Sequence, residues 1–115
     1  MKNIILIIAV IAISLSVSAQ NKTVKTSFKV YGNCGMCKER IEVALDTKGI
    51  KEVEWDVDTK MLQIVYDSSK ISMQQIHQKI TAVGHDTESD KAPDSIYVNL
   101  PKCCLFRDNK NTHHD

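Results

Sequence analysis

The sequence predicts an α+β fold, a ferredoxin-like βαββαβ open-faced sandwich in which two helices cover a four-stranded antiparallel sheet. Segments with an apolar residue at every second position alternate with segments whose apolar residues recur every three or four positions. Their order along the chain is strand, helix, strand, strand, helix, strand. Each helix has one apolar stripe and each strand one apolar face, and a two-layer sandwich buries all of these surfaces together.

The first strand and the first helix are separated by a short break. Residues 23–30 alternate between apolar and polar side chains, as a half-buried strand does. After the break, Ile41, Ala44 and Leu45 share one face at helical spacing. We expect this helix to end near Gly49, because glycine readily adopts the backbone conformation that closes a helix.

A hairpin and a second helix follow. Residues 53–57 and 62–66 alternate in the manner of strands around the polar turn 58–60, which predicts two antiparallel neighbours. Ser72 is expected to cap the second helix, with Gln75 three residues later as its partner in a capping box. The sequence therefore predicts both the hairpin and the start of the helix.

The end of the chain is less regular. Gly84 is expected to close the second helix, and residues 85–88 to form a short final strand. Residues 88–94 have the composition of a linker, and residues 96–100 fit either a weak strand or a helical turn opened by Pro93. Residues 107–115 are polar and are predicted to be a mobile tail.

The first 19 residues have the layout of a secretory signal peptide. Lys2 supplies a positive start, residues 4–13 are apolar, and Val17-Ser18-Ala19 offers a small-residue cleavage site. The apolar stretch is short for the roughly 20 residues that a bilayer-spanning helix needs. We therefore predict an exported protein, in the bacterial periplasm, whose mature form is not embedded in the membrane.

The length and charge of the chain limit the classes of function that it can have. The chain has 115 residues, enough for one compact domain. It has 15 Lys and Arg against 14 Asp and Glu, so no basic surface for nucleic acid is predicted. Serine and histidine residues occur without a nucleophile–base motif. The sequence therefore predicts a binding protein and not an enzyme.

Cys34-Gly35-Met36-Cys37 occupies the point where the first strand passes into the first helix. Two thiols three positions apart on such a loop can turn toward one point. The unpaired N–H groups and partial positive charge of a helix N-terminus favour thiolate over thiol. Thiolates select soft ions such as Cu(I), Hg(II) and Zn(II) over Mg(II) or Ca(II). Two sulfurs can satisfy a linear Cu(I) or Hg(II) ion, whereas tetrahedral Zn(II) requires two further ligands.

The segment from Gly32 to Glu42, with both cysteines, resembles the metal loop of heavy-metal-associated domains, a family that includes copper chaperones and periplasmic mercury-binding proteins. The hairpin resembles the central hairpin of that family, and the resemblance covers about residues 23–88. It implies a domain over residues 20–88, followed by an extension, residues 89–115, with a Cys-Cys pair and a polar tail. It also implies that Cys34 and Cys37 bind Cu(I) or a similar ion and pass it to a partner, such as a membrane metal-transporting ATPase or an efflux transporter.

One position departs from the pattern of that family. The family usually has a methionine two residues before the first cysteine, whereas this chain has Gly32 there and Met36 between the cysteines. The usual methionine is a buried tether more than a ligand. We therefore expect the departure to affect the rigidity of the loop more than metal binding.

Three further residues are candidate metal ligands. The family resemblance places His85 in a loop near the metal loop, so His85 is a possible third ligand, although an exposed loop histidine is the alternative. Cys103 and Cys104 can add thiolates, cross-link two chains, or pair with Cys34 and Cys37. His113-His114 is expected to be part of the solvated tail. The protein is expected to be a monomer, with metal-bridged dimers through the metal loop as a possibility.

Two other classes of protein remain open. A CxxC motif in an exported protein of this size also occurs in thiol-disulfide oxidoreductases. The alternating strand before Cys34 argues against this class, because the central strand of a thioredoxin is apolar on both faces. The second alternative is a domain stapled by disulfides. The amount of patterned core makes such staples unnecessary.

Overall fold

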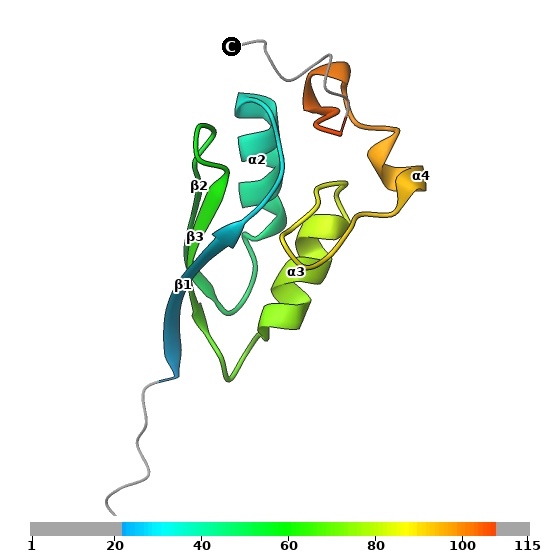
Figure 1. Ribbon diagram of the computed structural model, residues 1–115. Helices are drawn as coiled ribbons and strands as arrows, with labels where there is room; N and C mark the ends of the chain where they lie inside the picture. The colour runs from blue at the N-terminus through cyan, green and yellow to red at the C-terminus, as the bar shows by residue number, and fades with distance from the viewer. Residues whose placement is uncertain (1–21, 108–115) are drawn as a thin grey trace, which may run out of the picture.

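A computed structural model describes residues 22–107. The predicted signal peptide and the tail histidines lie outside these residues. The elements are β1 (Thr23–Lys29), α2 (Gly35–Ala44), β2 (Ile50–Trp55), β3 (Met61–Asp67), α3 (Met73–Thr81), α4 (Asp94–Tyr97) and the 3-10 turn η2 (Lys102–Cys104). Figure 1 shows α2 and α3 on one side of the sheet, with α4 and η2 beyond them. The predicted α+β class is confirmed.

The sheet has three antiparallel strands in the order β1-β3-β2. Leu62 in the central strand pairs with Phe28 on one side and with Trp55 on the other. All three side chains are buried, because alternation along each strand turns them toward the helices. The alternation in the sequence thus identifies the face of the sheet that forms the core.

The predicted fourth strand is not confirmed, because the sheet of the described residues has three strands. Residues 85–88 make a single bridge, between Thr87 and Val30. The backbone N–H of Thr87 bonds to Asp90 O at 2.8 Å, so the chain turns away directly after the bridge. Glu88 N donates a hydrogen bond to Lys29 O at 3.0 Å, and Lys29 N bonds to the side chain of Glu88 at 2.8 Å and not to its backbone. A turn therefore limits the pairing of this segment to an isolated bridge.

The capping box of α3 is confirmed. Ser72 Oγ accepts a hydrogen bond from Gln75 N at 3.1 Å, and Gln75 Oε1 accepts one from Ser72 N at 2.9 Å. The prediction for α2 was too long, since the helix ends at Ala44 and not near Gly49. Gly49 has a φ of 97°, so it supports the turn that leads into β2.

The hairpin is also confirmed, with one correction. β2 ends at Trp55, whereas the alternation predicted a strand as far as Val57. Asp56 Oδ1 accepts hydrogen bonds from the N–H groups of Asp58 and Thr59, so the chain is already turning at Asp56. The acidic residues at the end of the alternating run belong to the turn.

The C-terminal extension packs against the domain. Of the two interpretations of residues 96–100, the helical one is correct, because Asp94–Tyr97 forms α4 after Pro93. Tyr97, Leu100 and Cys104 are buried in the same core as the helices. Gly84 has a φ of 102°, and a Cβ there would lie 2.9 Å from Leu100 Cδ2, so only glycine permits this close packing.

Arg107 corrects the prediction that the mobile tail begins at that residue. Its guanidinium holds Asp86 through Nε–Oδ2 at 3.0 Å and Nη2–Oδ1 at 2.7 Å, a two-bond ion pair. Nη1 also bonds to Asp94 Oδ1 at 2.9 Å. The end of the described chain is therefore fixed to the domain by charge-assisted hydrogen bonds.

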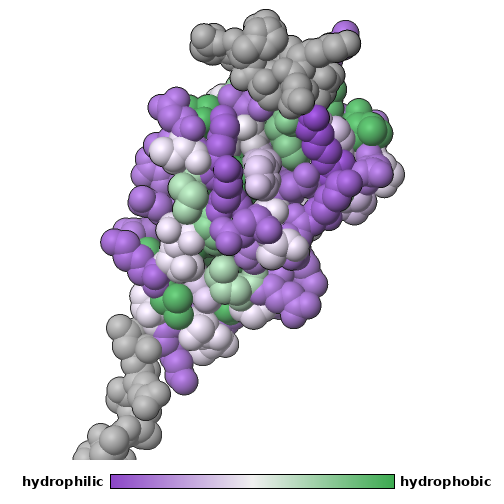
Figure 2. All heavy atoms as spheres, viewed as in Figure 1, coloured by the Kyte–Doolittle hydropathy of each residue, from purple (hydrophilic) through white to green (hydrophobic). Residues whose placement is uncertain are grey.

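The face of the molecule shown in Figure 2 is mostly hydrophilic, with hydrophobic side chains in small separate groups. Within residues 22–107, no helix has the length and apolar character that crossing a membrane requires.

Candidate metal centre

The loop that carries the first cysteine is held by Trp55. The indole Nε1 donates a hydrogen bond to Val30 O at 2.9 Å, and the ring is fully buried. Gly32 lies directly against this ring, since a Cβ on Gly32 would be 3.0 Å from Trp55 Cη2 and 3.1 Å from Cys37 Cβ. The tryptophan thus occupies the space that a side chain at position 32 would need, and it anchors the loop itself.

Cys34 and Cys37 lie at the start of α2, as the sequence predicts. Cys34 is the residue that precedes the first helical residue, with extended backbone, and Cys37 follows in the first turn. Their sulfur atoms are 3.6 Å apart. Asn33 N donates to Cys37 Sγ at 3.4 Å. Since the first turn contains no acidic residue, the positive end of the helix faces the sulfurs without a competing carboxylate.

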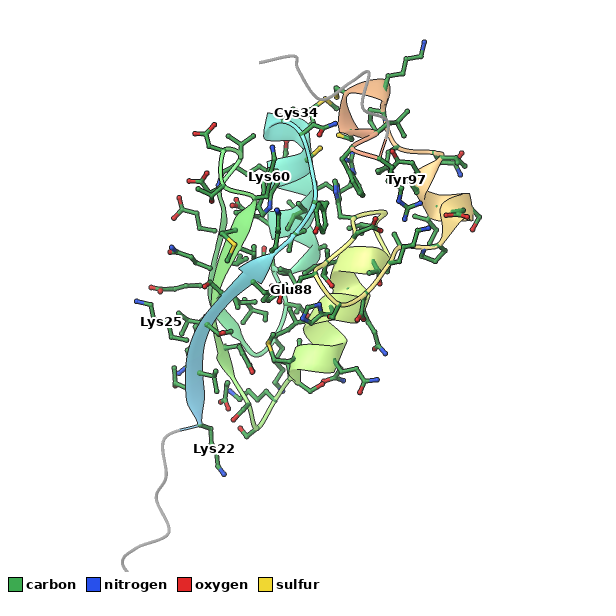
Figure 3. The ribbon with its side chains drawn as sticks, in the orientation of Figure 1. Lys22, Lys25, Cys34, Lys60, Glu88 and Tyr97 are labelled. Carbon is green, nitrogen blue, oxygen red and sulfur yellow. The ribbon has the colours of Figure 1, made fainter. Side chains whose placement is uncertain are left out.

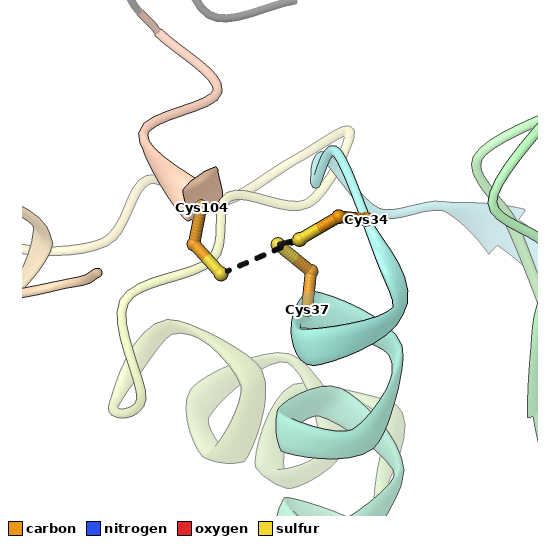
Figure 4. Close-up of side chains that lie close together, drawn as sticks. All are labelled: Cys34, Cys37 and Cys104. Atoms are coloured by element: carbon orange, nitrogen blue, oxygen red, sulfur yellow. Dashed lines mark hydrogen bonds between the residues drawn. The ribbon is translucent and has the colours of Figure 1, made fainter. Parts of the chain in front are cut away.

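Cys104, from the C-terminal extension, lies close to this pair. Its Sγ lies 3.9 Å from Cys34 Sγ, and the three sulfurs of Cys34, Cys37 and Cys104 all lie within 4.8 Å of one another. Figure 4 shows the three side chains converging, with Cys104 contributed by the turn η2. In Figure 3, Cys34 marks the end of the molecule where the extension meets α2. The structure therefore forms a cluster of three thiols.

Arg40 contacts the three-thiol cluster, and it was not among the residues predicted from the sequence. Its Nη1 lies 3.2 Å from Cys104 Sγ. Arg40 follows Cys37 by three residues and so shares its helical face, a spacing that could have identified it. A guanidinium at this distance stabilises negative charge on the sulfur.

The four thiols differ in acidity. Burial raises the pKa of Cys34, but the N–H groups of the first turn of α2 and the thiols of Cys37 and Cys103 outweigh burial and lower it to about 7. Burial raises the pKa of Cys37. Contact with Cys34 raises the pKa of Cys103 to about 11, and burial raises that of Cys104 to about 11. Cys34 is therefore the first thiolate, and contact with it helps to keep Cys37 and Cys103 protonated.

Cys103 lies outside the three-thiol cluster. Its side chain is exposed, and its Sγ lies 3.5 Å from Met36 Sδ and 3.8 Å from Cys104 Sγ. Its carbonyl oxygen accepts a hydrogen bond from Asn33 Nδ2 at 3.3 Å. Of the two adjacent cysteines, the structure thus brings Cys104 inward and leaves Cys103 at the surface.

His85 is buried, whereas the alternative to a ligand was an exposed loop histidine. Its Nδ1 lies 2.8 Å from Tyr31 O, and its ring stacks on Phe106 with centroids 5.4 Å apart. Burial lowers the pKa of His85, so the neutral form is favoured. Its Nε2 has no hydrogen-bond partner among the described residues, and His85 is not a member of the three-thiol cluster.

Comparisons with solved structures support the fold. The chain is 27% identical to the CopZ metallochaperone, with a TM-score of 0.53 over 56% of this chain and 98% of that chain. It is 30% identical to the ZiaAN sub mutant, with a TM-score of 0.51 over 62% of this chain and 99% of that one. The N-terminal soluble domains of Bacillus subtilis CopA are 23% identical, with a TM-score of 0.54 over 59% of this chain and 48% of that chain.

Comparison with curated proteins found no match. The profile of the heavy-metal-associated domain family matches residues 27–86, which is more than half of the chain and contains the metal loop, both helices of the sandwich and the hairpin. This chain therefore belongs to the heavy-metal-associated domain family.

Proposed function

We propose that this chain is an exported protein that holds one soft metal ion, first of all Cu(I), between Cys34 and Cys37, and passes it to a partner or sequesters it. The observation that carries the proposal is the pair of sulfurs 3.6 Å apart at the positive end of α2. A site of this kind favours ionised sulfur, which is the form that binds metal.

Cu(I) is the first choice because of the donor atoms. The cluster contains thiols only, with no carboxylate, so it suits a soft ion. A tetrahedral Zn(II) site would need a fourth ligand in addition to the three clustered thiols. The CopZ metallochaperone, 27% identical to this chain, supports a role in holding and passing on a metal ion. Hg(II) and Zn(II) are the alternatives.

Export and the partner are further parts of the proposal. The signal-peptide pattern of residues 1–19 supports export to the periplasm. The family resemblance suggests a membrane metal-transporting ATPase or an efflux transporter as the partner that receives the ion. The mature chain is proposed to be a monomer.

The test is a competition titration of the reduced chain, residues 20–115, with Cu(I) and with Zn(II) in the presence of a chromophoric chelator. Native mass spectrometry then gives the stoichiometry. One tightly held Cu(I) per chain is expected, and the variant Cys34→Ser/Cys37→Ser should lose it. If the reduced chain binds no soft ion tightly, the proposal fails, and the CxxC pair would be examined as a redox dithiol.

The oxidoreductase alternative has one supporting observation, the pKa of about 7 of Cys34. The structure of the strand before Cys34 argues against the oxidoreductase alternative. β1 alternates between more and less exposed residues and pairs only with antiparallel neighbours within the described sheet. The continuous apolar strand of a thioredoxin core is therefore not found at this position.

A further inference from the structure

We propose that Cys104 is a third thiolate ligand, so that the C-terminal extension closes a three-sulfur site with Cys34 and Cys37. This inference rests on the proposed function, because it adds a ligand to the same ion. It goes further by making the extension a working part of the site and by predicting the coordination number. Cys34 and Cys37 then provide only two of the three ligands.

The distances between the sulfurs fit three-coordination. With metal–sulfur bonds of about 2.3 Å, two thiolates on opposite sides of an ion are about 4.6 Å apart, and three in a plane are about 4.0 Å apart. Cys34 Sγ lies 3.6 Å from Cys37 Sγ and 3.9 Å from Cys104 Sγ. Linear binding would require the CxxC sulfurs to separate, whereas three-coordinate binding requires only a small adjustment.

The surroundings of Cys104 also suit a ligand. The residue is completely buried, and the guanidinium of Arg40 lies 3.2 Å from its sulfur. A monovalent ion with three thiolates has excess negative charge, which a buried site tolerates only with a positive partner. Arg40 supplies that charge directly at the sulfur of Cys104.

The extension holds Cys104 in place before any metal arrives. Arg107 is bound to Asp86 by two hydrogen bonds, and Phe106 stacks on His85 with an interplanar angle of 19°. These contacts lie directly after the turn that carries Cys104 and join it to the loop that follows α3. Because the ligand is already ordered, binding does not have to overcome the entropy of a free tail.

The neighbouring cysteine provides a matched control. Cys103 is exposed, and its sulfur contacts Met36 Sδ at 3.5 Å instead of entering the cluster. The two residues share the same turn and the same chemistry but differ in direction. A serine at position 103 therefore tests the loss of a thiol from the extension without the loss of the proposed ligand.

The first measurement compares Cu(I) affinities of the reduced chain (residues 20–115), Cys104→Ser and Cys103→Ser by chelator competition. Cys104→Ser should bind at least about tenfold more weakly, because a hydroxyl is a poor ligand for a soft ion. Cys103→Ser should bind like the unchanged chain. Equal affinity in all three proteins, or equal loss in both variants, would overturn the inference.

The second measurement does not depend on the folding of a variant. X-ray absorption at the copper edge counts the sulfurs around one equivalent of Cu(I) in the unchanged chain, and we expect three. Tight binding with only two sulfurs would overturn the role of Cys104 and leave the proposed function intact. Failure of the unchanged chain to bind Cu(I) would instead refute the proposed function itself.

Discussion

At the scale of single residues, the cysteine thiols differ in acidity because their surroundings differ. Cys34 and Cys103 are both accessible, yet their pKa values lie in opposite directions from that of an ordinary thiol. The N–H groups at the start of α2 favour charge on Cys34. That charge, once formed, opposes ionisation of Cys103.

This difference predicts the order of alkylation by iodoacetamide. The thiolate is the reactive form, so the rate at Cys34 should rise as pH increases through about 7 and level off above it. Cys103 should react slowly at pH 7 despite its exposure, because the pKa of about 11 keeps it protonated. Peptide mapping by mass spectrometry after short exposures at a series of pH values measures both rates. Faster reaction at Cys103 than at Cys34 would contradict the assignment.

Gly32 provides a second prediction at the scale of single residues. Gly32→Ala should lower the free energy of unfolding by about 1–3 kcal/mol, because the new Cβ overpacks against the ring of Trp55. Gly35→Ala is the control, since a Cβ there meets nothing within 4 Å and helix propensity favours alanine by up to about 1 kcal/mol. Urea denaturation of both variants provides the comparison. Equal stability would show that the ring does not restrict position 32.

At the scale of elements, local signals predicted the helices and strands well. The capping box of α3 depends only on Ser72 and Gln75, which are close in sequence, and it formed as expected. The predicted fourth strand is prevented by the turn at residues 87–90, where Thr87 Oγ1 accepts hydrogen bonds from Ser89 N and Asp90 N. The sequence pattern does not reveal a turn of that kind, so a fourth strand was predicted where the structure has only an isolated bridge.

In the candidate site, too, the sequence predicted only the features that depend on residues close together in the chain. The pair Cys34 and Cys37 was predictable because the spacing and the helix start are local. The position of Cys104 was not, because it depends on contacts about 70 positions apart in the chain. Likewise, no local pattern at Arg107 indicates that its partner is Asp86. Sequence reasoning identified the chemistry of the extension but not the residue that turns inward.

The extension provides a prediction at this scale. Arg107→Ala removes the hydrogen bonds to Asp86 and should lower the free energy of unfolding by roughly 1.5–3 kcal/mol. It should also speed the alkylation of Cys104 by loosening η2. Lys91→Ala is a matched control, because Lys91 pairs with Asp94 at 4.0 Å with both side chains exposed, and its loss should change stability by less than about 1 kcal/mol. Unchanged reactivity of Cys104 in Arg107→Ala would show that the ion pair does not hold the extension.

At the scale of the whole molecule, the extension and the sandwich act together. The start of α2 and the C-terminal extension meet at one end of the molecule (Figure 1), where the thiols of Cys34, Cys37 and Cys104 cluster. A two-cysteine loop leaves a soft ion accessible, which favours transfer to a partner. A third ligand from the same chain would slow release, and would favour retention.

Oligomeric state tests this arrangement. The unchanged chain should remain monomeric after loading with one equivalent of Cu(I), because Cys104 fills the third position. Cys104→Ser should form Cu(I)-bridged dimers, since the open position can accept a cysteine of a second chain. Light scattering coupled to size exclusion, with and without Cu(I), distinguishes the two states. Dimerisation of the unchanged chain to the same extent would contradict the closing role of Cys104.

The most direct test of the central claim is a two-dimensional ¹H–¹⁵N NMR titration of the reduced chain (residues 20–115) with Cu(I). If the ion is held at the start of α2, the amide signals that change should be those of residues 32–38 and 102–105, with saturation at one equivalent. Changes confined to other parts of the chain, such as the tail histidines, would contradict the account. So would a spectrum that does not change at all.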